Sequence, residues 1–451
     1  MQDLTTGSIT RHLLKTTSFM LVTMLFQTLY VLIDLYWVGR LGKEAVAAVA
    51  ISGNLTFIVL AVTQMLGVGT TTLVSHAVGR KEQERALLVF NQSQVLAMVV
   101  GALFLVVAMA ARLPYARALS ADAETTALAA DYLLWFIPAM ALQFGMEAMG
   151  AALRATGNFK PGMIVQTATV ILNMLLAPFL IFGWFTGVAM GVRGAALSTF
   201  VAIIIGIVWM STYFLKPSGY LHLVPALWRP RVSLWGQMLK VGLPAGAEFA
   251  LLAVYLFIVY VVSRPFGAAA QAGFGIGLRI VQAGFLPVVA LGFAVAPVAG
   301  QNYGARHADR VRKTFASAAS LAGGLMLIFA AVCHIAPAAM IRFFSNDPNV
   351  VAVGDEYLRI VSWNFVASGI IFVGSSMFQA IGNTIPPLIT SFLRLVLVAV
   401  PILMLSRNPH FTLRWVWYLS VASVTLQLIL NLLLLRREFN LRLRFDNVVP
   451  A

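Results

Sequence analysis

Acidic side chains stand inside long apolar stretches of this 451-residue sequence, where a charge is costly. Asp34 lies within MLFQTLYVLIDLYWVGRLG, and Glu248 lies within VGLPAGAEFALLAVYLF. An isolated charge in the middle of a membrane costs about 2.5–3.5 kcal/mol on insertion scales, so such residues commonly face protein or water and carry function. On a helix, Gln27, Tyr30 and Asp34 share one face at spacings i, i+3 and i+7. A polar stripe on an apolar span should face protein or water rather than lipid.

Two further polar positions accompany these acids. Asn173 lies deep in the apolar stretch TATVILNMLLAPFLIF, where a lone Asn more often joins two helices than binds a ligand. Glu147, in FGMEAMGAALRATGN, precedes Arg154 by seven residues. It could line the same cavity as the acids and contact substrate, or it could pair with Arg154 locally. The sequence leaves both interpretations open.

Structural interpretations of both acids also stay open. Asp34 could lie near the end of its span and reach out of the bilayer or form a structural pair. Glu248 lies about a dozen residues into its span, so its alternative is to be the buried partner of an arginine such as Arg394.

The sequence offers little material for catalysis. Its six histidines include no HExxH pair, and GVGTTT lacks the GK[ST] ending of a phosphate-binding loop. We therefore expect no enzyme activity and no cofactor. Nothing in the sequence indicates ATP binding.

The overall composition is that of a protein that crosses a membrane many times. Apolar residue types make up 60% of the chain, charged types make up 10%, and the mean hydropathy is +0.88. A water-soluble domain carries about 25% charged residues. The net charge of +15 could suggest nucleic acid, but the cations lie between the apolar stretches, where they set topology and meet anionic lipid head groups. We expect no nucleic-acid partner.

Apolar stretches of about 20 residues predict an all-α polytopic membrane protein with twelve transmembrane helices. The predicted spans are 16–38, 45–78, 89–111, 124–153, 163–183, 191–214, 237–262, 270–300, 313–337, 349–380, 385–406 and 413–435. If both termini lie on one side of the membrane, that side receives 19 of the 31 Lys and Arg residues and the other side receives 9. The richer side should be cytoplasmic.

The two halves of the chain are related by an internal repeat with an offset of 225 residues. GVGTTTLVSHAVGRKEQERA begins at Gly67 and GFAVAPVAGQNYGARHADRV at Gly292, while ATGNFKP at Ala155 corresponds to AIGNTIP at Ala380. Each half holds six spans, so both enter the membrane in the same orientation, a transporter design with a site between the halves. The predicted parts are an N-terminal six-helix bundle at 1–214, a cytoplasmic linker at 215–236, and a pseudo-symmetric C-terminal six-helix bundle with a short cytoplasmic tail at 237–451.

Several short motifs occur in a consistent order along the spans. They are DLYWVGRLG after the first span, ALRATGNFKP after the fourth, LNMLLAPFLIFG and GVRGAALST around the fifth and sixth, and GLPAGAEF opening the seventh. In these motifs, and over nearly its whole length, the chain resembles the multidrug and toxic compound extrusion (MATE) family. The resemblance implies a cation-coupled antiporter that exports organic, mostly cationic or amphipathic compounds by alternating access as H+ or Na+ enters.

The expected setting is the cell inner (cytoplasmic) membrane, with a multi-pass chain and both termini in the cytoplasm. We expect a monomer whose partners are small organic substrates and membrane lipids.

The resemblance also implies roles for single residues in the N-terminal half. Asp34 matches the first-span acid of the family, with Gln27 and Tyr30 on its helix face, and the resemblance implies that these three residues and Glu147 bind substrate and that Asp34 also binds the coupling cation. Asn173 and Thr199 match polar neighbours of the ion site that one branch of the family has in this half.

Three features set this chain apart from the family pattern. Glu248 resembles the seventh-span acid of other branches, but it lies about one helical turn closer to the Gly-Leu-Pro motif. Ala177 stands where members with the N-terminal-half site often carry Asp, and the tenth span, IIFVGSSMFQAIGN, has no acid. We expect transport to run on an ion gradient, but the coupling ion, H+ or Na+, and the half that binds it stay open. Na+, if it is used, is expected at Asp34 or Glu248.

The closest rival function is a lipid-linked oligosaccharide or lipid flippase on a related scaffold of two bundles. Such a protein would hold a pyrophosphate with cavity arginines, for which Arg279 and Arg394 are available. A net acidic cavity would favour the exporter and a net basic one the flippase.

Overall fold

The computed structural model describes residues 2–184, 187–217, 219–406, 408 and 410–445. Within this part of the chain the protein is all-α, and twelve segments are long and apolar enough to cross a membrane, as the sequence predicts. The α-helices are α1 (Ile9–Gly39), α2 (Lys43–Gly79), α3 (Gln83–Leu119), α4 (Ala123–Ala155), α5 (Phe159–Phe182), α6 (Gly191–Thr212), α7 (Val232–Ser263), α8 (Ala268–Gly304), α9 (Ala308–Ile335), α10 (Pro337–Arg342), α11 (Pro348–Val361), α12 (Phe365–Ala380), α13 (Ile385–Leu405) and α14 (Leu413–Arg442).

Short 3-10 helices interrupt or connect these elements at η1 (Pro225–Trp228), η2 (Arg264–Phe266) and η3 (Ser362–Asn364). The tenth span differs most from the simple prediction, because η3 divides it into α11 and α12. A 3-10 turn inside a helix makes tighter and poorer hydrogen bonds than an α-helix does, so it often marks a bend or a functional position.

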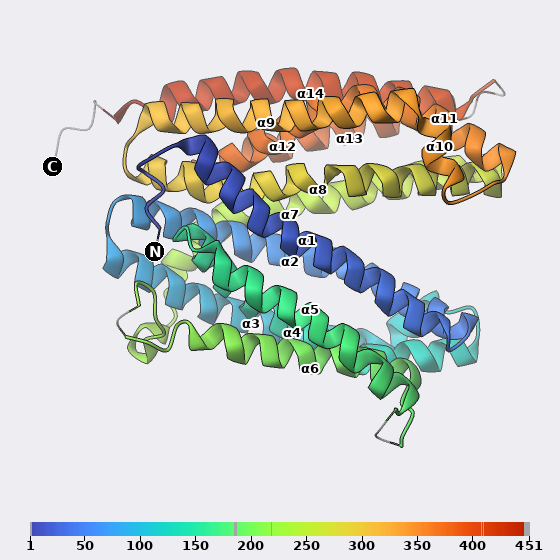
Figure 1. Ribbon diagram of the computed structural model, residues 1–451, viewed down its shortest axis with the longest axis horizontal. Coiled ribbons are helices and arrows are strands. Elements are labelled where there is room, and N and C mark those ends of the chain that lie inside the picture. The colour runs from blue at the N-terminus through green and yellow to red at the C-terminus, as the bar shows by residue number, and fades with distance from the viewer. Residues whose placement is uncertain (1, 185–186, 218, 407, 409, 446–451) are drawn as a thin grey trace. The chain divides into compact units, whose positions relative to one another are not determined.

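The helices form two compact units, which we call the first and second bundle. Among the described residues, the first bundle comprises 2–3 and 18–246, and the second comprises 4–17 and 247–445. In the first bundle, α4 packs against α2, α3 and α6, and α5 packs against α6 (Figure 1). In the second, α8 packs against α9, α11 and α12, and α14 packs against α12 and α13 (Figure 1).

The backbone repeats at the offset that the sequence predicts. Lys81, after α2, has a left-handed φ of 62°, and Arg306, after α8, has a φ of 60°. Gly157, after α4, and Gly382, after α12, have φ values of 75° and 76°. Left-handed residues end helices by turning the chain away from the axis. The two bundles are therefore pseudo-symmetric in where and how their helices end.

Helix packing repeats as well. A Cβ atom added to Gly67 on α2 would lie 2.9 Å from the Glu147 carboxylate on α4. At the equivalent place in the second bundle, a Cβ on Gly292 of α8 would lie 2.4 Å from the Phe372 ring on α12. Only glycine permits this approach, because it has no side chain. The repeat thus preserves a close helix crossing while the neighbouring side chain changes from acid to aromatic.

Aromatic side chains fill the interior of each bundle. In the first bundle, Phe90 stacks on Phe214 with ring centroids 4.5 Å apart. In the second, Phe274 stacks on Trp417 at 5.3 Å, and Tyr357 meets the same indole edge-on at 4.8 Å. Such pairs add about 0.5–1.5 kcal/mol to the burial of the rings themselves. Many other large apolar side chains point outward, as expected for helices that face lipid.

Candidate functional site

Three predicted residues of the first bundle are joined by hydrogen bonds. The Tyr30 phenol on α1 lies 3.2 Å from the Thr199 hydroxyl on α6. The Asn173 amide on α5 donates to the same hydroxyl at 2.9 Å. Thr199 is 6% exposed and Asn173 is 4% exposed, so this contact lies in the interior of the bundle. The structure therefore brings together residues from three helices that the sequence could only place on separate spans.

Asp34 adds a carboxylate to this cluster. It is 9% exposed, and its Oδ1 atom has no hydrogen-bond partner among the described residues. The carboxylate is close enough to the phenols of Tyr30 and Tyr132 to interact with them electrostatically. The Oδ1 atom of Asn173 is likewise buried and unpartnered in the described chain. Two free oxygen acceptors and a negative charge in one buried cluster suit a proton or a hard cation, which prefers oxygen ligands.

Gln27 and Ala177 contribute little to this cluster as it stands. The Gln27 side chain is exposed on α1, although it shares a helix face with Tyr30 and Asp34. Ala177 is 1% exposed and follows Asn173 by one turn of α5, so it points a methyl group where an acid would supply a ligand. The assignment of Gln27 to substrate binding stays a prediction.

Glu147 pairs with Arg154 along α4. The guanidinium donates a short, charge-assisted hydrogen bond to Glu147 Oε1, and Arg154 itself is 8% exposed. The pair is local, which is the structural alternative that the sequence left open. A part for Glu147 in substrate binding stays a prediction that this contact does not require.

The acid of the second bundle is held by hydroxyl groups. Ser375 on α12 and Ser391 on α13 donate to Glu248 Oε1 at 2.9 Å and 3.2 Å. Gln427 on α14 donates to Ser391 at 3.1 Å, and its own Oε1 atom is buried without a partner in the described chain. Glu248 thus lies between Ser375 and Ser391 in a chain of polar side chains that spans four helices, α12, α7, α13 and α14.

Arg394 does not pair with this acid in the part of the chain that the structure describes. Its guanidinium lies over the Tyr255 ring, 5.2 Å from the centroid, in a cation–π contact. The Tyr255 phenol donates to Ser420 at 3.3 Å. The structural alternative of a buried Glu248–Arg394 ion pair is therefore not the arrangement seen among the described residues.

Sequence reasoning missed several buried amides of the second bundle. Asn364, Gln427 and Asn431 are 4%, 4% and 1% exposed, and each has at least one side-chain atom without a described partner. The sequence does indicate these amides, because a polar residue within an apolar span is commonly functional or contacts another helix. The amides of the tenth and twelfth spans carry no charge, so a sequence search for buried charges identifies the acids and passes over these amides.

Comparison with known proteins places the chain in a well-defined group. The MatE family model matches residues 20–179 and 244–405, one segment in each half. The chain is 25% identical to the probable multidrug resistance protein YoeA of Bacillus subtilis (strain 168), covering 91% of this chain and 90% of that one. It is 27% identical to the multidrug export protein MepA of Staphylococcus aureus (strain MRSA252), covering 90% of this chain and 88% of that protein.

Solved structures share the fold. A MATE structure in a bent conformation superposes with a TM-score of 0.91 at 23% identity, covering 99% of this chain and 98% of that one. A transporter of the MOP superfamily from Pyrococcus furiosus, described as having a binding pocket of reversed polarity, superposes with a TM-score of 0.90 at 24% identity, covering 98% of each chain.

Proposed function

The chain belongs to the MatE family of multidrug efflux transporters, and we propose that it exports organic, mostly cationic or amphipathic compounds in exchange for H+ or Na+. The curated relatives with which it shares most of its length are named multidrug export or resistance proteins. The protein is a multi-pass membrane transporter rather than an enzyme. We further propose that it works as a monomer in the inner membrane, with both termini in the cytoplasm.

The observation that carries this proposal is the cluster of Tyr30, Asp34, Asn173 and Thr199. In the described part of the chain, one oxygen of the buried Asp34 carboxylate and the Oδ1 atom of Asn173 are both without a hydrogen-bond donor. A proton on Asp34 would supply the missing donor, and a sodium ion would supply a positive charge to both oxygens. The residues present therefore fit either coupling ion.

Coupling follows if an organic cation and the coupling ion compete for the same negative charge. A ligand can shift a conformational equilibrium only through different affinities for the two states. Alternating access then requires that the state opening outward favours the coupling ion, and that the state opening inward favours the organic cation. Glu248, held by Ser375 and Ser391, is the proposed second participant in the other bundle.

The proposal is tested in proteoliposomes loaded with a fluorescent organic cation. We expect dye export under an imposed gradient of either Na+ or pH, and the gradient that drives export identifies the coupling ion. The double variant Asp34→Asn, Glu248→Gln should abolish export while keeping the folded protein. Asp309→Asn, which removes an exposed acid of α9, is the matched control and should export normally. Normal export by the well-folded double variant would overturn the assignment.

A further inference from the structure

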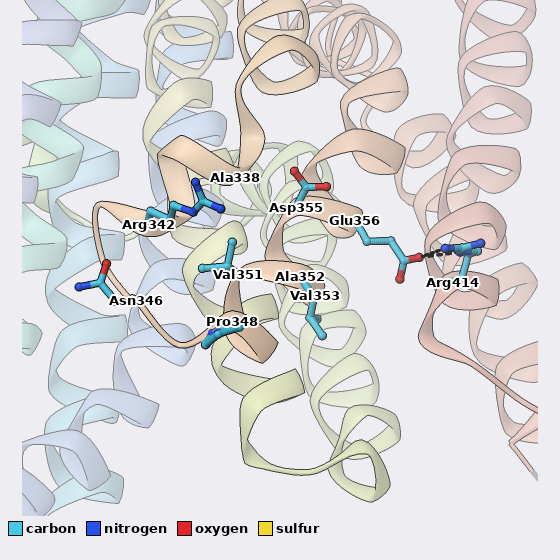
Figure 2. A pocket seen from close by; sticks show the side chains of 10 residues that line it. All are labelled: Ala338, Arg342, Asn346, Pro348, Val351, Ala352, Val353, Asp355, Glu356 and Arg414. Atoms are coloured by element: carbon cyan, nitrogen blue, oxygen red, sulfur yellow. Dashed lines mark hydrogen bonds and ion pairs between the residues drawn. The ribbon is translucent and has the colours of Figure 1, made fainter.

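The second bundle contains a pocket that no part of the proposed transport cycle uses. It has a volume of about 680 Å³ and lies where α10, the first turns of α11 and the first turn of α14 meet (Figure 2). Its polar lining residues are Arg342, Asn346, Asp355, Glu356 and Arg414. Sites for small ligands commonly have about 300–1,000 Å³ and a few polar groups that fix orientation, so the size and the lining both suit a ligand.

The pocket arises where the two repeats differ in backbone. In the first bundle, α3 continues without a break to Leu119. In the second bundle the equivalent helix ends at Ile335, Ala336 leaves helical geometry with φ −133° and ψ 44°, and α10 restarts at Pro337. The short α10 segment that follows this break supplies Ala338 and Arg342 to the lining of the pocket.

The two repeats also differ in the side chains at this place. The Asp131–Arg193 ion pair of the first bundle has a counterpart in Glu356–Arg414. Asp355, the residue before that pair, stands 225 residues after Ala130, which is buried. A fold that accepts alanine at this position does not need a carboxylate there. Asp355 is therefore a feature of this pocket and not of the repeat.

One oxygen atom of Asp355 lacks a donor. Arg359 donates from Nε to Asp355 Oδ2 at 2.8 Å, while Oδ1 is buried and has no hydrogen-bond partner among the described residues. A buried acceptor without a donor is costly, so a ligand with an N–H group would be favoured there.

Arg342 supplies a free positive charge to the same pocket. Figure 2 shows it on the side of the pocket away from the Glu356–Arg414 pair. Its guanidinium enters no ion pair or hydrogen bond in the part of the chain that the structure describes. A guanidinium binds phosphate oxygens through two parallel N–H groups, which makes phosphate its favoured anionic partner.

The setting of the pocket is the edge of the membrane-crossing region. It is built from the end of one span and the beginnings of two others. Directly after Arg342, Phe343 is 84% exposed and Phe344 is 61% exposed, and Ile335 before α10 is 81% exposed. Exposed aromatic and aliphatic side chains at the ends of spans anchor a protein at the level of lipid head groups. The ligand that reaches this pocket most readily is therefore a lipid.

We propose that the pocket binds the head group of a phospholipid that carries a primary ammonium group, as phosphatidylethanolamine does. Arg342 binds the phosphate, and the ammonium donates a hydrogen bond to Asp355 Oδ1. A choline head group carries the same charges but has no N–H, so it leaves Oδ1 without a donor. The pocket should consequently prefer ethanolamine to choline lipids.

The test is lipid retention by the delipidated full-length protein in detergent, counted by native mass spectrometry. The probes are phosphatidylethanolamine, its mono- and dimethylated derivatives, and phosphatidylcholine with identical acyl chains. We expect about a tenfold preference for phosphatidylethanolamine over phosphatidylcholine, the size of effect that one hydrogen bond to a charged group produces. Because this series uses the wild-type protein, it does not depend on any variant folding. Equal retention of all head groups would overturn the proposal.

Single variants then test which residue binds the ammonium group and which binds the phosphate group of the lipid. Asp355→Ala removes the side-chain acceptor and should bring the ethanolamine preference close to one, whereas Arg342→Gln should lower retention of both lipids and Arg342→Lys should restore part of it. Asp309→Asn, an exposed acid of the same bundle outside the pocket, should change neither. Arg359→Gln removes the donor to Oδ2 and leaves Oδ1 in place, so the preference should survive. A preference that persists in Asp355→Ala would contradict the assignment.

A soluble head group tests whether the pocket binds a membrane lipid or a free zwitterion with the same phosphate and ammonium groups. Free phosphoethanolamine offers the phosphate and the ammonium without acyl chains. We expect it to displace the lipid only at concentrations far above that of the lipid, because the chains hold the head group at the membrane edge. Displacement at equal concentration would identify a site for soluble zwitterions and overturn the lipid assignment. Dye export by the same variants is a separate measurement, so loss of the lipid preference and loss of transport can be told apart.

Discussion

Tyr30 and Tyr255, which are 225 residues apart, make the same hydrogen bond in the two bundles. The Tyr30 phenol lies 3.2 Å from the Thr199 hydroxyl on α6, and the Tyr255 phenol lies 3.3 Å from the Ser420 hydroxyl on α14. Each tyrosine thus contacts the last helix of its own bundle through a side-chain hydroxyl. The duplication preserved this contact although the surrounding side chains diverged.

The charge beside this shared contact differs between the bundles. Asp34 lies one turn after Tyr30, whereas Val259, its counterpart at the same offset, is 1% exposed and apolar. Arg394 stands over the Tyr255 ring, whereas its counterpart at the same offset in the first bundle is Thr169. The tyrosine of one bundle therefore has an acid beside it and that of the other has a cation. The two copies cannot bind the same ion in the same way.

Removing the Thr199 hydroxyl should weaken both the first bundle and export. Thr199→Val keeps the shape but leaves the Asn173 amide and the Tyr30 phenol without their partner. Each buried polar group left unpaired costs about 1–3 kcal/mol. We expect a lower melting temperature by differential scanning fluorimetry and slower dye export. Thr28→Val is the control, since that exposed hydroxyl bonds only to its own helix. Equal effects of the two variants would contradict a special part for Thr199.

Glu248→Gln should separate folding from coupling. The Gln carbonyl can still accept hydrogen bonds from Ser375 and Ser391, so we expect the melting temperature to change little. The amide cannot be ionised, and export driven by an ion gradient should fall to background while binding of the dye to the detergent-solubilised protein persists. Parallel loss of binding and export would instead place Glu248 in the substrate site.

The architecture could be predicted from the sequence because it depends on patterns within single segments. Long apolar runs predict spans, and Gly, Pro and basic residues recurring at one offset predict the repeat. All twelve predicted spans match helices. The division of the tenth span at Ser362–Asn364 was not predicted, because those residues do not interrupt the apolar run strongly enough.

The candidate site was predictable only in part. The shared face of Tyr30 and Asp34 follows from helix periodicity, which acts within one helix. The meeting of Tyr30 with Thr199 and Asn173 depends on how three helices cross, and no local pattern encodes that crossing. The resemblance to a known family supplied the expectation for Asn173 and Thr199. Neither helix periodicity nor the family resemblance could predict the pocket at Asp355, because it depends on a local break in the repeat.

A methyl group at Gly242 should be strongly unfavourable. A Cβ there would lie 2.1 Å from the Met65 backbone oxygen on α2, which cannot move aside as a flexible side chain would. Overpacking of this kind costs about 1–3 kcal/mol. We expect Gly242→Ala to lower the melting temperature. Gly236→Ala, on the same helix with nothing within 4 Å, is the matched control and should leave it unchanged or raise it. An unchanged melting temperature in Gly242→Ala would show that the helices separate readily.

Asn91 on α3 should hold the segment 219–231 in place within the first bundle. Its amide, which is 0% exposed, donates to the His222 backbone oxygen at 3.0 Å and accepts from the Val224 N–H at 2.8 Å and the Trp228 indole at 3.0 Å. Asn91→Leu removes all three contacts, so we expect faster cleavage of residues 219–231 by added protease. Gln83→Ala, which removes a single exposed contact, is the control. Cleavage at the wild-type rate in Asn91→Leu would show that other contacts fix this segment.

Asp122 should make the stability of the α3–α4 turn depend on pH. The Thr125 backbone N–H donates to its carboxylate at 2.7 Å and the Thr125 hydroxyl at 2.9 Å, and these bonds hold the pKa of Asp122 below its ordinary value. A lowered pKa in the folded state stabilises the protein above the unfolded value of about 3.9, and this contribution is lost as the pH falls toward the folded value. We expect the melting-temperature difference between wild type and Asp122→Ala to be full near neutrality and to shrink below about pH 4. Asp309→Ala, which lacks these bonds, should show no such trend, and a difference independent of pH would mean that the charge of Asp122 does not matter to the turn.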